Sequence, residues 1–132
     1  MLTRLDNSEL LDLLFDRMPM GIAVFDRAYR LVRCNPTWLE FVEKYSPLAE
    51  GASIRGKSWF EIAPGTEEQV LPLFDAVLAG ETIQREGLRL ESGGIRSAWD
   101  LVLSPLIRGQ HVAGIILVAT DATERVAMAD EL

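Results

Sequence analysis

Residues 21–45 constrain the fold more than any other segment, because they join two short apolar runs directly to the start of a helix. Residues 22–26 and 29–34 are rich in β-branched and aromatic side chains, and a short polar hairpin connection fits between them. Asn35 is a favoured N-cap residue, and Pro36 suits the first helical position because its missing N–H is not needed there. This segment predicts a β-hairpin that leads straight into a helix.

The segment before the hairpin predicts an amphipathic helix over residues 6–18. Asp6 followed by Glu9 fits a helix start, and Pro19 ends the helix. Apolar side chains at helical spacing share one face of it: Leu10, Leu11, Leu14, Phe15 and Met18. This stripe either packs on its own domain or pairs with a second copy of the chain.

The middle of the chain predicts a loop over 46–56, one or two helical turns over 57–63, and a longer helix over 66–79. Thr66 and Gln69 have the spacing of a capping box at the start of the longer helix. Pro72 lies inside its apolar pattern, where it can kink the helix, and Gly80 follows its end.

Three strands and a last helix are expected after residue 82. In residues 83–91, Glu86, Leu88 and Leu90 share one face of the predicted strand. In the next strand positions 99, 101 and 103 share a face, with positions 100 and 104 opposite. Residues 112–120 are apolar on both faces, as in a strand that is central in its sheet or covered on both sides.

The order of these elements predicts an α+β fold, with a five-stranded antiparallel sheet and helices on one face. We expect residues 1–19 to form the N-terminal amphipathic helix, residues 20–121 the folded core, and residues 122–132 the start of an exit helix. Asp121 with Glu124 has the spacing of a helix start at this last boundary.

Composition excludes several classes of function. The 132 residues fit one domain, and 13 basic against 20 acidic residues give a net charge of -7 with no basic cluster, so we expect no nucleic-acid binding. No apolar run approaches the roughly 18 residues of a membrane helix, and the acidic N-terminus does not resemble a signal peptide. The single cysteine, Cys34, suits a reducing compartment, so a cytoplasmic location is expected.

The chain resembles the PAS fold over roughly residues 8–126, and three local features carry the resemblance. The first is the strand and hairpin that begin with residues 21–26 (GIAVFD) and end at Asn35. The second is Ser104-Pro105-Leu106 before a glycine-containing turn, with Gly114 in the last strand. The third is residues 121–125 (DATER), similar to the Asp-Ile-Thr-Glu-Arg that often ends these domains.

The resemblance implies a sensory or relay module whose terminal helices connect to an effector such as a histidine kinase or a diguanylate cyclase. The sequence contains no kinase or cyclase motif, so the effector is expected outside this chain, and the chain is interpreted as a fragment of a longer protein. A ligand-free dimerisation module is the alternative. No catalytic set of Ser, His and Asp supports an enzyme, and a small α+β isomerase or hydratase is a remote third class.

The resemblance also bears on cofactors. A haem-binding PAS domain carries its ligating histidine on the long helix before the last three strands, whereas His111 is in a hairpin turn. A flavin-binding relative carries Asn-Cys-Arg-Phe-Leu-Gln on a helix, whereas Cys34 precedes Asn35 at a strand end. One histidine and one cysteine cannot supply the four ligands of a typical zinc site. We therefore expect no haem, flavin or metal, and either an unidentified small apolar ligand or none.

Eight side chains are candidates for the lining of a pocket: Leu31, Arg33, Phe41, Trp59, Phe74, Trp99, Leu101 and Leu103. The apolar ones fill a core as readily as they line a cavity, and both interpretations stay open. Arg33 lies two positions after Leu31 on the predicted strand. It therefore either points inward, toward an anionic ligand or Glu86, or faces water.

The terminal helices supply two further candidates. Leu10, Leu11, Leu14 and Met18 are the candidate interface of a homodimer. Asp121 and Glu124 are the candidate signal relay, in which Asp121 caps the exit helix and holds it to the sheet.

Overall fold

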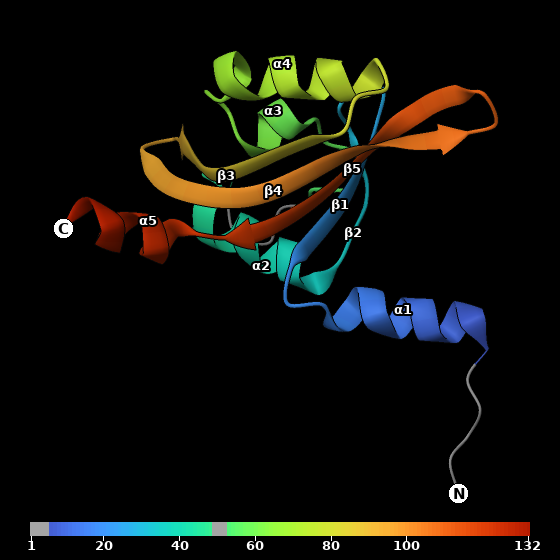
Figure 1. Cartoon of the computed structure of the whole chain (residues 1–132), viewed down its shortest axis with the longest axis horizontal. Helices are drawn as coiled ribbons and strands as arrows, with labels where there is room; N and C mark the ends of the chain where they lie inside the picture. The colour runs from blue at the N-terminus through green and yellow to red at the C-terminus, as the bar shows by residue number, and fades with distance from the viewer. Residues whose placement is uncertain (1–5, 49–52) are drawn as a thin grey trace, which may run out of the picture.

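The computed structural model describes residues 6–48 and 53–132, and the predicted α+β fold is confirmed there (Figure 1). Within these ranges the elements are, in chain order, α1 (Asn7–Arg17), β1 (Gly21–Asp26), β2 (Leu31–Cys34), α2 (Pro36–Tyr45), α3 (Trp59–Ile62), α4 (Glu67–Leu78), β3 (Ile83–Ser92), β4 (Ile95–Arg108), β5 (His111–Asp121) and α5 (Thr123–Asp130). The predicted loop over 46–56 includes residues 49–52, which lie outside the described ranges. No helix of the described residues is long and apolar enough to span a membrane.

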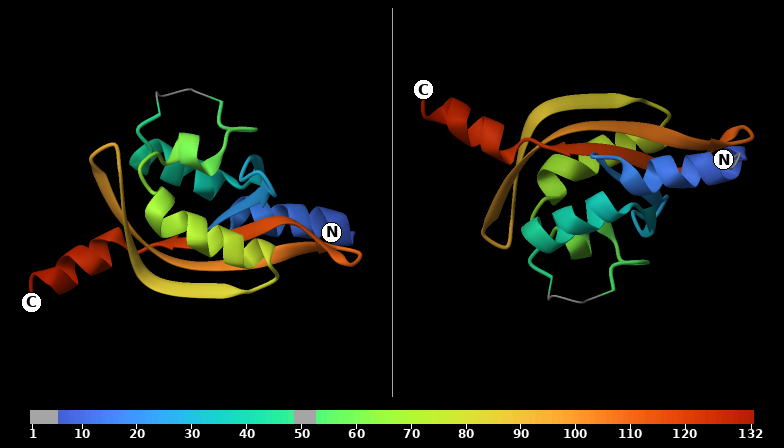
Figure 2. Two further views of the ribbon diagram at one scale, coloured as in Figure 1. Left: turned by 90° about the horizontal axis from the view of Figure 1, so that it is seen from above. Right: turned by 90° about the horizontal axis from the view of Figure 1, so that it is seen from below.

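The strands form one antiparallel sheet in the order β2-β1-β5-β4-β3. β5 lies at its centre, as its apolar sequence predicts. Helices α2, α3 and α4 cover one face of the sheet, and α1 and α5 leave the core at opposite ends (Figure 2). The core therefore lies between the sheet and three helices, and both terminal helices project away from it.

Asn35 joins three elements and not only one. Its Oδ1 accepts hydrogen bonds from the Trp38 N–H at 3.0 Å, as expected of an N-cap, and from the Ile22 N–H at 2.9 Å. Its Nδ2 donates to the carbonyls of Phe15, at 3.1 Å, and Met20, at 2.9 Å. The fully buried amide thus ties the end of α1, strand β1 and helix α2 together.

The second strand begins later than its apolar run predicts. Asp26 Oδ1 accepts from the N–H groups of Ala28, at 2.8 Å, and Arg30, at 3.0 Å, and so closes a compact turn. Tyr29 within this turn has a φ of 62°, in the left-handed region. Extended pairing resumes only at Leu31, so the prediction of a strand from residue 29 was wrong at its start.

The sequence signals for helix α4 were wrong at its N-terminus and right at its C-terminus. The capping box of Thr66 and Gln69 was wrong: Thr66 Oγ1 donates to the Ala63 carbonyl at 2.8 Å and makes no side-chain cap. The C-terminus agrees with the prediction, because Gly80 has a φ of 102° and its N–H donates to the Val77 carbonyl.

A bulge interrupts β3 between Arg85 and Leu88. Gly87 has a φ of 63° there, a conformation that glycine adopts without strain. Glu86 is exposed whereas Leu90 is buried, so the strict alternation expected for residues 83–91 was wrong at the bulge.

The core centres on aromatic rings. The Phe25 ring centroid lies 5.9 Å from that of Trp38, 5.9 Å from that of Trp59 and 5.7 Å from that of Phe74. Strand β5 approaches β1 so closely that a Cβ on Gly114 would lie 2.2 Å from the Phe25 carbonyl oxygen. Glycine at this position therefore allows the central strand pair to form.

Candidate functional site

A cavity of about 80 Å³ lies between the sheet and helices α2, α3 and α4. Helix α2 supplies one wall through Phe41, and strand β4 supplies another through Trp99; their ring centroids are 5.0 Å apart. Further apolar side chains come from α3, α4, β3 and β5. The cavity is therefore a partly open apolar space bordered by elements from both layers of the fold.

The cavity brings together six of the eight predicted lining residues: Phe41, Trp59, Phe74, Trp99, Leu101 and Leu103. Leu31 is buried in the adjoining core and is not part of the wall. The six residues converge because β4 presents alternate positions to the helices, and because α2, α3 and α4 each turn one apolar face to the sheet.

Arg33 lies outside this cavity, so of its two predicted orientations the structure has the one that faces water, and the inward one toward Glu86 was wrong. It pairs in register with Val24 on the face of the sheet opposite the cavity, where α1 lies near. Its guanidinium lies 4.4 Å from the Phe15 ring centroid, and its Nη2 is 3.5 Å from Asp12 Oδ1. The Arg33 guanidinium on the edge strand β2 thus contacts α1 and is otherwise exposed.

Most polar groups at the cavity wall already have partners. Three hydroxyl groups donate to main-chain carbonyls: Ser46 to Ile62 at 2.5 Å, Thr66 to Ala63 at 2.8 Å and Ser92 to Pro64 at 2.7 Å. Two of the three wall indole N–H groups donate to hydroxyl oxygens, Trp59 to Thr66 at 3.0 Å and Trp99 to Ser97 at 2.8 Å, whereas that of Trp38 has no hydrogen-bond partner among the described residues. Among the described residues, no carboxylate, lysine, arginine or histidine lines the cavity.

Metal-ligating side chains do not gather in the described parts of the chain. No group of three or more His, Cys, Asp or Glu residues there has an arrangement that could hold a metal ion. His111 is exposed at the start of β5. Burial raises the pKa of the half-buried Cys34 thiol, which disfavours the thiolate that would bind a metal.

Tyr45 connects the cavity to the end of the sheet, although it was not among the predicted site residues. Its ring lines the cavity and meets Trp99 edge-on, with centroids 5.2 Å apart and an angle of 82°. Its hydroxyl donates to Asp121 Oδ2 at 2.5 Å. The helical spacing of Trp38, Phe41 and Tyr45 was a usable signal, because it places the three rings on one face of α2.

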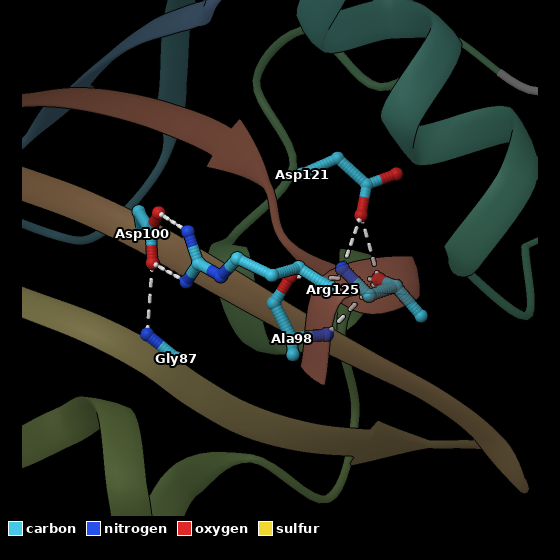
Figure 3. Close-up of polar contacts among 6 residues, drawn as sticks. Gly87, Ala98, Asp100, Asp121 and Arg125 are labelled. Atoms are coloured by element: carbon cyan, nitrogen blue, oxygen red, sulfur yellow. Dashed lines mark hydrogen bonds and ion pairs between the residues drawn. The ribbon is translucent and has the colours of Figure 1, made fainter. Parts of the chain in front are cut away.

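Asp121 accepts hydrogen bonds from the first residue of α5, but it lies one position before the N-cap residue. Helix α5 begins at Thr123 with Ala122 at the N-cap position, so the expected start at residue 122 was one residue early. Asp121 Oδ1 accepts from the Thr123 N–H at 3.0 Å and from Thr123 Oγ1 at 2.6 Å (Figure 3). Burial raises the pKa of Asp121, but the hydrogen bonds from Thr123 and Tyr45 outweigh it, so the pKa lies below its usual value. Glu124, the other relay candidate, is exposed on the first turn.

Helix α1 exposes the predicted stripe. Leu10, Leu11 and Leu14 are 47%, 65% and 52% exposed, and Met18 is half-buried. No residue of α1 is buried in the described structure of the single chain. The stripe is therefore free to meet a partner.

A sheet with helices over one face and an apolar cavity between the layers defines a class of small α+β domains that can enclose a ligand. The sequence profile of the PAS fold matches residues 15–127, so the chain belongs to the PAS family, whose members are sensory and signalling domains. No curated protein matches the chain in sequence.

Solved structures of PAS domains share this fold at low sequence identity. The PAS domain of a protein from Colwellia psychrerythraea superposes with a TM-score of 0.71 at 15% identity, covering 91% of this chain and 100% of that one. The PAS domain of nitrogen regulation protein NR(II) from Vibrio parahaemolyticus gives 0.62 at 14%, covering 85% and 97%. A domain of a sensory box sensor histidine kinase/response regulator from Geobacter sulfurreducens gives 0.63 at 16%, covering 86% and 93%.

Proposed function

We propose that this PAS domain binds a small, neutral, apolar molecule in its cavity and relays the binding through its terminal helices to an effector outside this chain. The observation that carries the proposal is the apolar space between the two layers, most of whose wall donors are already hydrogen-bonded. An anionic ligand would find no cation among the described wall residues and would lose its hydration without compensation. A neutral molecule would lose little hydration free energy on entering the cavity.

The volume limits the size of the ligand. Sites for drug-sized ligands span roughly 300–1,000 Å³, and an apolar cavity of roughly 150 Å³ takes up benzene or xenon. A cavity of about 80 Å³ accepts only a few heavy atoms unless its wall moves. We therefore propose that the domain uses neither haem nor flavin. The wall also lacks the charged groups of an isomerase or hydratase, so we propose that the domain is not an enzyme.

A histidine kinase is the proposed effector. One of the similar structures supports it, because the domain from Geobacter sulfurreducens belongs to a sensor histidine kinase/response regulator. The lone half-buried thiol fits a reducing compartment, so we propose a cytoplasmic location. The net charge of -7 supports a module without nucleic-acid partners.

The proposed assembly is a homodimer formed by α1. An isolated helix of 11 residues is marginal in water, and α1 buries none of its residues on its own chain. A second copy presents the same stripe of Leu10, Leu11, Leu14 and Met18, so the two helices can bury it symmetrically.

Native mass spectrometry of freshly purified protein, compared with the denatured mass, tests ligand binding. We expect extra mass that disappears on denaturation and is absent from Ala119→Leu, because the larger side chain fills the cavity from β5. Thr120→Leu, at an exposed position of the same strand, is the matched control and should keep the extra mass. A polypeptide mass alone, together with no NMR shift of the cavity residues under xenon, would contradict the proposal.

A ligand-free scaffold is the second candidate, and the packing of the rings favours it. Phe25, Trp59 and Phe74 pack ring against ring, with centroids 5.7 to 5.9 Å apart, as they would in a core with no ligand. Under this alternative the α1 pairing persists and xenon produces no shift at the cavity wall.

A further inference from the structure

We infer that Tyr45 is the residue through which the cavity controls the exit helix α5. The inference rests on the proposed function, since it assigns the route by which occupation of the cavity reaches the C-terminal helix. Tyr45 is part of the cavity wall and also a hydrogen-bond donor to the residue that holds α5. One side chain therefore contacts both the cavity and the carboxylate that binds the start of α5.

The connection from Tyr45 to α5 contains only one intermediate. The Asp121 carboxylate accepts from Tyr45 through Oδ2, and from Thr123 through Oδ1. Thr123 is the first residue of α5, and its Oγ1 also accepts from the Ala98 N–H at 3.1 Å. A displacement of the Tyr45 hydroxyl thus removes one of the two supports that orient this carboxylate.

Tyr45 also lies where the wall can move. It is the last residue of α2, whereas Trp99 is in the middle of the sheet and Phe74 is inside α4. Helix ends lose fewer hydrogen bonds on local opening than strands within a sheet. Because the cavity holds about 80 Å³, a larger molecule held fully inside it must displace a wall. We expect the Tyr45 ring to move, and its hydroxyl to leave Asp121.

Loss of this bond loosens α5 without detaching it. Two exposed ion pairs also hold the helix: Arg125 to Asp100 and Arg89 to Asp130. The cavity and α5 therefore influence each other reciprocally, and a ligand shifts α5 only by as much as it prefers the displaced position of Tyr45.

The test is a double-mutant cycle read by hydrogen exchange of the amides of α5. Tyr45→Phe removes the hydroxyl and keeps the ring in the wall. Ala119→Leu fills the cavity, so no natural ligand is needed. We expect Tyr45→Phe alone to speed exchange in α5 by roughly tenfold, the scale of one charge-assisted hydrogen bond. Ala119→Leu should speed it in the wild-type background and add nothing in the Tyr45→Phe background.

Equal effects of Ala119→Leu in both backgrounds would overturn the inference, because the filled cavity would then act on α5 by another route. Unchanged α5 exchange in Tyr45→Phe would also overturn it. Thr120→Leu controls for a large side chain next to Asp121, and Ala63→Leu fills the same cavity from the α3 side if Ala119→Leu does not fold. Failure of xenon or mass spectrometry to detect binding would refute the proposed function and leave this coupling to be judged by the cycle alone.

Discussion

Arg125 of helix α5 and Asp100 of strand β4 form a two-bond ion pair, with Nη1 to Oδ2 and Nη2 to Oδ1 both at 2.7 Å (Figure 3). The same carboxylate accepts from the Gly87 N–H at 2.9 Å, so the bulge of β3 supplies a third donor. The exit helix is therefore attached to both strands of the β3-β4 hairpin by one carboxylate. A paired fork of this kind fixes the direction of a side chain better than a single contact.

Replacing Arg125 with Ala should loosen α5 and leave the sheet unchanged. The substitution removes both bonds to Asp100, so we expect faster hydrogen exchange in α5 and unaltered exchange in β4 and β5. Arg96→Ala is the matched control, because the Arg96 Nε lies 4.0 Å from Glu91 and its side chain is 87% exposed. Equal exchange of α5 in the two variants would show that the Arg125 pair does not hold the helix.

The stabilisation that the Arg125–Asp100 pair contributes should also depend on pH in the acid range. Hydrogen bonds from Arg125 and Gly87 lower the pKa of Asp100 from 3.8 to about 2. A group whose folded pKa is depressed contributes stability that is complete above its unfolded pKa and is lost as the pH falls through its folded value. The difference in free energy of unfolding between wild type and Asp100→Asn should thus be constant from pH 7 to about 4 and decline toward pH 2. Urea unfolding at a series of pH values measures it, and a decline that is complete by pH 5 would contradict the assignment.

The elements that the sequence predicted well are those specified by neighbouring residues. Asn35 and Pro36 predict the start of α2 through local capping chemistry. The apolar run of residues 112–120 predicts a central strand. Glycine past the end of α4 acts through its own backbone conformation. Each of these signals operates within one element, so a single stretch of sequence contains it.

What the sequence left open depends on contacts between distant residues. Tyr45 and Asp121 are 76 positions apart, and their bond exists only after the sheet has brought β5 beside α2. The direction of Arg33 likewise depends on the strand pairing, because an irregularity between Val24 and Phe25 of β1 puts Arg33 opposite Val24 and Leu31 opposite Phe25. Local patterns therefore identified six residues of the cavity wall but not its connection to α5.

Asn35→Ala should destabilise the whole domain and not only α2. The substitution leaves two carbonyls and two N–H groups without their partner in a fully buried position, which costs about 2–4 kcal/mol of unfolding free energy. Urea denaturation followed by tryptophan fluorescence measures the loss. Asn7→Ala, at an exposed amide, should cost less than about 0.5 kcal/mol. A loss confined to about 1 kcal/mol for Asn35→Ala would reduce its role to that of an ordinary N-cap.

Leu11→Glu combined with Leu14→Glu should convert the proposed dimer into a folded monomer. A buried leucine contributes about 2 kcal/mol, and a symmetric dimer contains each leucine twice, so the dissociation constant should rise by more than about a hundredfold. Sedimentation velocity measures the change, and circular dichroism checks that the fold is retained. Leu13→Glu is the matched control, because Leu13 is 40% exposed on the same helix but lies off the stripe, and it should leave the dimer intact. A folded dimer after the double substitution would remove the stripe from the interface and place the contact between copies elsewhere on the domain.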